Sequence, residues 1–110
     1  MTGRVIEVDK ALIPYRFRVN LGDSTFEVEV FYNLEYDYFT VNLWYLGALI
    51  VQNEKLMYGK QLFTNLKYLP LPAVGIIPLD LSGQADRITF ENLGESVFLY
   101  VIEEGDISDI

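Results

Sequence analysis

The sequence predicts an all-β protein, a small antiparallel sandwich or barrel of about seven to eight short strands with at most one short helix. Three observations favour this class. Aromatic residues make up 15% of the 110 residues and Val and Ile are frequent, which suits half-buried pleated strands. Apolar and polar residues alternate with a period of two in several segments. Glycines stand singly between these segments, as turn residues do.

An early strand is expected over residues 4–8, and a clear hairpin follows it. Residues 15–21 and 25–32 both alternate apolar with polar side chains, on either side of Gly22-Asp23. Gly supplies the positive φ that a tight two-residue turn requires. A shift by one residue would set core side chains opposite charges, so the register is fixed. It pairs Tyr15 with Val30, Arg16 with Glu29, Phe17 with Val28, Arg18 with Glu27, and Val19 with Phe26.

The middle of the chain predicts two more strands and a short helical segment. Residues 38–46 alternate, and residues 48–52 form a further strand. Asn53-Glu54 is expected to be a turn. Residues 58–69 space their apolar side chains as one or two helical turns, which Pro70 ends.

The remaining strands are expected over residues 72–81 and in a second hairpin over residues 87–103. Residues 80–83 look like a turn. The second hairpin turns at Gly94-Glu95 and sets Phe90 opposite Leu99 and Ile88 opposite Val101.

The last strand is apolar on both faces. Phe98, Tyr100 and Ile102 lie on the face that alternation would leave polar. Such a strand is either central in a two-layer fold or docked on another chain.

The chain is expected to form one β domain over residues 1–102, followed by an acidic tail over residues 103–110. Residues 68–110 hold half of the 16 acidic residues and a single base, Arg87. The tail has too little apolar content to form an element alone, so we expect a partner to order it if anything does.

Composition excludes several classes of function. The net charge of −8 works against binding nucleic acid or anionic lipid. With no Cys and no His, the chain lacks thiolate nucleophiles, imidazole bases and the ligands of zinc sites, so no cofactor, metal or catalytic residue is expected. Residues 69–79 are too short and too rich in proline to span a membrane, and no signal pattern is present, which predicts a soluble protein.

Paired carboxylates remain as the candidates for general acid and base chemistry. Glu27 with Glu29, or Glu35 with Asp37, could form a catalytic pair, but the first pair already faces arginines across the hairpin and solvated pairs are ordinary. Residues 80–86 loosely resemble a calcium loop without its bidentate glutamate, and a turn is the better interpretation.

Aromatic residues near the predicted bend at residues 33–38 are better candidates for binding. Tyr36 and Tyr38 lie at the bend, and Trp44 shares a strand face with Tyr38. A protein, or less favourably a sugar, could stack there. Alternatively, Trp44 fills the second layer of a sandwich.

Several segments in this order resemble the baseplate hub plug family of contractile-tailed phages, including cyanophages. The segments are residues 12–17 (LIPYRF), 33–40 (NLEYDYFT), 56–63, 77–83 (IPLDLSG) and 92–100. Each motif is short, so the resemblance lies in their order and spacing from about Val5 to Val101. The family brings no catalytic motif.

The resemblance implies a non-enzymatic virion protein, made in the host cytoplasm, that closes the distal end of the tail tube. The implied partners are hub, tail tube or baseplate wedge proteins. An acidic surface in a DNA conduit would repel the duplex rather than bind it. From the exposure pattern alone we expect the contacts to be Tyr36, Tyr38, Trp44, Phe98, Tyr100, Glu103, Glu104 and Asp106.

Two other functions stay open at this point. A carbohydrate- or protein-binding β-sandwich without catalysis would use the aromatic bend. An acidic decoy that mimics DNA would use the charge of residues 68–110, although DNA mimics usually spread their charge over an elongated surface.

Overall fold

A computed structural model describes residues 4–22, 24–64 and 74–102 and confirms the all-β class. In these ranges the chain forms strands and one short 3₁₀ helix, with every strand pair antiparallel. The elements are β1 (Val5–Ile6), η1 (Lys10–Leu12), β2 (Tyr15–Leu21), β3 (Ser24–Asn33), β4 (Tyr38–Tyr45), β5 (Ala48–Lys55), β6 (Gly75–Leu79) and β7 (Phe98–Ile102).

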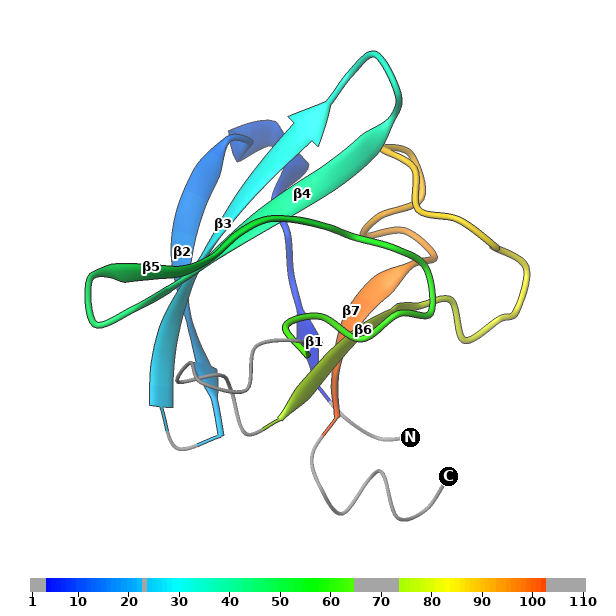
Figure 1. Ribbon diagram of the computed structural model, residues 1–110. Coiled ribbons are helices and arrows are strands. Elements are labelled where there is room, and N and C mark those ends of the chain that lie inside the picture. Colours follow the sequence, from blue (N-terminus) through cyan, green and yellow to red (C-terminus); the bar gives the residue numbers. More distant parts are fainter. Residues whose placement is uncertain (1–3, 23, 65–73, 103–110) are drawn as a thin grey trace.

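The strands form two sheets, so the fold is a sandwich rather than a barrel. One sheet has the order β2-β3-β4-β5 and the other the order β1-β7-β6. Figure 1 shows β1 and β7, the first and last strands of the chain, side by side in the second sheet. The early strand is thus confirmed at Val5–Ile6, shorter than the expected residues 4–8.

The predicted β2–β3 hairpin is confirmed in every pair of its register. Gly22 has a φ of +68°, as the turn requires. The ion pair across the hairpin differs from the prediction. Arg16 Nε lies 3.3 Å from Glu27 Oε2, so Arg16 pairs diagonally across the strands with Glu27 and not with Glu29, the residue directly opposite it.

β4 lies where the sequence predicts it, but β5 is longer than expected. The expected turn at Asn53-Glu54 is wrong, since both residues lie inside β5. Asn53 has a φ of +59° where the register of β4 and β5 shifts, and its N–H donates to Asn42 Oδ1 at 2.8 Å. The left-handed backbone conformation of Asn53, which Asn tolerates, therefore forms a β-bulge and does not reverse the chain.

The second predicted hairpin is wrong. Only its last part is a strand, β7, and this strand pairs with β1 and β6 instead of residues 87–93. The side chain of Asn92 accepts from the Thr89 N–H at 2.8 Å and donates to the Arg87 carbonyl at 2.9 Å. Its own carbonyl accepts from the backbone N–H groups of residues 95–97. These local bonds hold a compact loop and compete with a strand ladder.

β7 is the central strand of its sheet, as the first of the two explanations of its apolar faces requires. Tyr100 is flanked by Val5 on β1 and Ile77 on β6.

No helix forms in the described part of residues 58–69, which is residues 58–64. Gly59 donates to the Pro78 carbonyl at 2.9 Å and Leu62 to the Ile76 carbonyl at 2.8 Å, so this segment follows the edge of β6. These bonds to another element replace the bonds of a helix. Residues 65–69 lie outside the described residues.

The expected turn at residues 80–83 is confirmed. Gly83 has a φ of +76° and donates to the Asp80 carbonyl at 2.9 Å. β6 precedes this turn, as the extended pattern of residues 72–81 predicts, although residues 72 and 73 lie outside the described residues.

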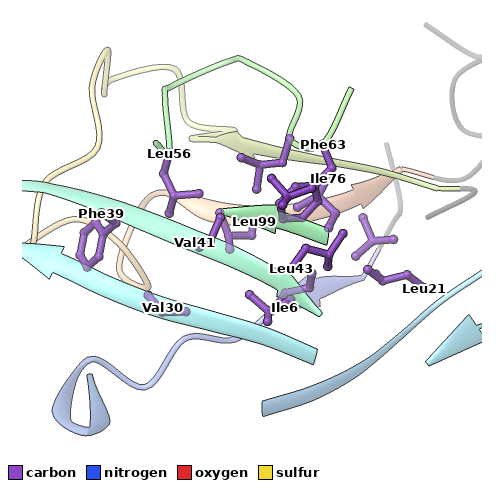
Figure 2. Close-up of a cluster of buried hydrophobic side chains, with 14 of the residues drawn as sticks. Ile6, Leu21, Val30, Phe39, Val41, Leu43, Leu56, Phe63, Ile76 and Leu99 are labelled. Atoms are coloured by element: carbon purple, nitrogen blue, oxygen red, sulfur yellow. The ribbon is translucent and has the colours of Figure 1, made fainter. Parts of the chain in front are cut away.

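The core fills the space between the two sheets. Figure 2 shows Val41 and Leu43 of one sheet pointing toward Ile76 and Leu99 of the other. Phe39 and Leu43 have no exposed surface. Outside the strands, Leu56, Leu62 and Phe63 are also buried and extend the core over the loop that follows β5.

Candidate docking surface

The tight turn between β3 and β4 displays two large apolar side chains. The Asn33 side chain accepts from the Tyr36 N–H at 3.0 Å, and Asp37 closes the turn with a φ of +56°. Leu34 is 83% exposed and Tyr36 is 68% exposed at its tip. A turn fixed by its own hydrogen bonds therefore presents apolar surface to solvent.

Asp37 ties this turn to the loop that precedes β7. Its Oδ1 accepts from the Tyr32 hydroxyl at 2.6 Å and from the Phe90 N–H at 2.9 Å. Arg87 Nη2 donates to the Asp37 carbonyl at 3.2 Å and lies 3.6 Å from its Oδ2. In Figure 1 the turn lies at the top of the view, beside this loop.

These contacts shift the pKa values of both partners. The hydrogen bond from Tyr32, followed by that from Phe90, holds the pKa of Asp37 below its ordinary value. The same bond, and then burial, raises the pKa of Tyr32 above its ordinary value. The carboxylate is thus held ionised as a structural acceptor.

An aromatic cluster packs beside the turn. The ring centroids of Tyr32 lie 4.9 Å from those of both Phe39 and Phe90. Lys10 donates to the Phe90 carbonyl, and its Nζ lies 5.0 Å from the Phe90 ring. Phe90 is still 40% exposed, so it continues the apolar surface that begins at Leu34.

Two shallow hollows adjoin the turn. One, of about 590 Å³, is lined by Tyr32, Leu34, Asp37, Thr89, Phe90 and Glu91. The other, of about 820 Å³, is lined by Phe31, Tyr32, Asn33, Tyr36, Tyr38, Thr40, Asn53 and Lys55. We call the surface formed by Leu34, Tyr36, Tyr38 and Phe90, with these two hollows, the β3–β4 end. Exposed apolar side chains beside hollows are typical of protein interfaces.

A family model described as cyanophage baseplate Pam3 plug gp18 matches residues 4–104 of the chain. The chain belongs to this family of phage baseplate plugs. It is a structural protein of the tail baseplate, located in the virion among other baseplate and tail proteins. The match extends over every strand of the sandwich and over the β3–β4 end. No curated protein matches the chain.

The aromatic residues singled out from the sequence of this plug-family protein lie on different surfaces. Tyr36 and Tyr38 lie together at the β3–β4 end. Trp44 lies on the same outer face of β4 as Tyr38 but near the other end of the strand. Its Nε1 donates to Glu29 Oε1 at 3.0 Å, and the Arg16 guanidinium lies 4.4 Å from its ring.

Phe98 and Tyr100 lie on the outer face of the three-stranded sheet. Their rings meet edge to face at 6.2 Å, and both are half-buried. The acidic residues Glu103, Glu104 and Asp106 lie outside the described residues.

Leu34, Phe90 and the Asp37 contacts were missed by sequence reasoning. Alternation assigned Phe90 to a strand that does not form. The exposure of Leu34 follows from its place in the 33–38 bend, a signal that could have found it. The bond between Asp37 and Phe90 joins residues 53 apart, and no local pattern reveals it.

The carboxylates considered for chemistry are mostly engaged in structural contacts. Glu29 accepts from Trp44 and from Asn42, whose Nδ2 lies 3.1 Å away. In the loop that loosely resembles a calcium site, Asp80 accepts through Oδ1 from the N–H and hydroxyl of Ser82 and through Oδ2 from Gln84 and Ala85.

Two further findings concern the described residues alone. They contain no group of three or more carboxylates, histidines or cysteines arranged to hold a metal ion. Within the same ranges, no helix is long and apolar enough to cross a membrane.

Proposed function

We propose that the chain closes the distal end of the tail tube as a non-catalytic plug, and that it docks on its hub, tube or wedge neighbours through the β3–β4 end. The observation that carries this proposal is the display of Leu34 and Tyr36 on a turn fixed by Asn33 and Asp37. A turn whose backbone is already fixed by hydrogen bonds loses little backbone entropy on docking.

Charge supports the same role. The chain has a net charge of −8, so duplex DNA moving through the tube would be repelled rather than retained. A plug must also leave its seat, and a surface of a few exposed side chains suits a modest, reversible interface.

Sugar binding is less well supported. Lys55 Nζ lies 4.6 Å from the centroid of the Tyr38 ring, and Arg16 covers the Trp44 ring in the same way. A cation on a ring face occupies the position in which a sugar would stack.

The docking role is tested by replacing the tip side chains. The double variant Leu34→Ser/Tyr36→Ser removes apolar surface without touching the core, so its melting temperature should match that of the unmodified chain. We expect its amount in purified particles, measured by quantitative mass spectrometry, to fall about tenfold or more.

Leu46→Ser is the matched control. Leu46 is 85% exposed at the tip of the β4–β5 turn, and its replacement should leave incorporation unchanged. Normal incorporation of the double variant, or equal loss of both variants, would overturn the assignment of docking to the β3–β4 end.

A further inference from the structure

Three of the four sheet edges are protected from pairing with another strand. The edge of β6 is covered by the hydrogen bonds of Gly59 and Leu62. β5 is bulged where Asn53 adopts its positive φ, and β1 has only two residues. Short, bulged or covered edges are the usual defences of a sheet. By contrast, β2 keeps an unbroken register with β3 over its seven residues.

The hairpin geometry determines which backbone groups of β2 point outward. Leu21 and Ser24 flank the two-residue turn, and residues in that position exchange both of their hydrogen bonds. Bonding then alternates along β2, so Arg16, Arg18 and Asn20 direct their N–H and C=O groups away from β3. All three residues are exposed, and no backbone hydrogen bond joins them to a described residue outside the hairpin.

The inner side chains of β2 are also incompletely covered. Tyr15, Phe17 and Val19 face the core but are only half-buried, whereas Val28 and Val30 of β3 are 4% and 0% exposed. A strand added beside β2 would bury more of these three side chains.

The charge on the outer face of β2 selects the kind of strand that fits. Arg16 is shared between Glu27 and the Trp44 ring, whereas Arg18 has no ion-pair partner among the described residues. A second copy pairing antiparallel through its own β2 would bring arginines opposite arginines, which is destabilising. An acidic side chain opposite Arg18 would be favourable.

We propose that β2 is a docking edge for an extended segment of a different protein, with acidic residues on the face of Arg16 and Arg18 and aliphatic residues on the other face. This is the pattern that β3 already presents to β2 from within, where Glu27 and Glu29 alternate with Phe26, Val28 and Val30. Main-chain hydrogen bonds supply affinity in such strand addition, and alternate side chains supply specificity. The proposal goes beyond the plug role and adds a second contact at a different surface.

The test uses the full-length, ¹⁵N-labelled chain and two seven-residue peptides, one alternating Val with Glu and the other Val with Lys. In the free chain, the amides of Arg16, Arg18 and Asn20 should exchange with solvent at least about tenfold faster than those of Phe17 and Val19. The Val–Glu peptide should slow this exchange and shift these resonances. The Val–Lys peptide should need about tenfold higher concentration for the same shifts.

Arg18→Glu should reverse the preference between the two peptides. Lys60→Glu, an exposed residue outside the sheets, should leave it unchanged. Slow exchange of the three outward amides in the free chain, equal binding of both peptides, or shifts confined to β5 would overturn the proposal. Because the isolated chain is used, this result is independent of whether the chain closes the tail tube.

Discussion

Single carboxylates organise the loops of this protein at the residue scale. Asp80 is 6% exposed, and its two oxygens accept hydrogen bonds from Ser82, Gln84 and Ala85. Asp37 does the same between the β3–β4 turn and the loop that precedes β7. In both places an ionised acceptor satisfies backbone N–H groups that the sheets do not pair.

Asp80 should make stability sensitive to acid. The hydrogen bonds from Ser82, above all from its hydroxyl, hold the pKa of Asp80 below its ordinary value. A lowered folded-state pKa contributes stability that is present above the ordinary pKa, about 3.9, and is lost as pH falls through the folded value. The Asp80→Asn variant should therefore melt at a lower temperature at neutral pH and lose less stability between about pH 5 and pH 2.

Thermal unfolding followed by circular dichroism over this pH range checks the Asp80 prediction. Asp86→Asn, an exposed residue of the same loop, should melt near the temperature of the unmodified chain. If Asp80→Asn and the unmodified chain have the same melting temperature at pH 7, the Asp80 hydrogen bonds do not hold the loop.

At the element scale, the sequence predicts an element correctly where the interactions that fix it lie within one short segment. It fails where those interactions come from elsewhere in the fold. The β2–β3 hairpin could be predicted because alternation, charge pairing and the φ of Gly22 all act within one short segment. The same turn signals misled at Asn53, where the left-handed conformation forms a bulge, and at Gly94-Glu95, where the Asn92 side chain closes a loop instead of a hairpin.

The candidate surface was only half predictable for the same reason. Tyr36 and Tyr38 belong to one bend that the sequence reveals. Phe90 reaches that bend through the packing of the second layer, and its bond to Asp37 is a tertiary contact. Sequence patterns predict faces of elements but not which loops meet.

The bulge at Asn53 can be tested directly. A β-branched residue at a φ of +59° is strained, so Asn53→Val should destabilise the fold by about 1–3 kcal/mol. Asn53→Gly accepts the same φ without strain and should cost about half as much or less. Urea unfolding measures both. Equal stability of the Val and Gly variants would show that the positive φ is not maintained in solution.

At the scale of the whole molecule, size and charge are the properties that bear on the proposed plug role. The Cα trace extends 33 × 32 × 21 Å, and the net charge is −8. Leu34, Tyr36 and Phe90 expose apolar surface at the β3–β4 end, and β2 is an edge strand of the four-stranded sheet. Docking at the β3–β4 end and strand addition at β2, as proposed, would use two different surfaces of the sandwich.

Electron cryo-microscopy of intact, DNA-filled particles tests the central claim most directly. Antibody fragments against an epitope tag on the chain would mark its position. We predict density for the β-sandwich across the lumen at the distal end of the tube, with the β3–β4 end against a hub, tube or wedge protein. An open lumen at that end, with the chain attached elsewhere on the particle, would contradict the account.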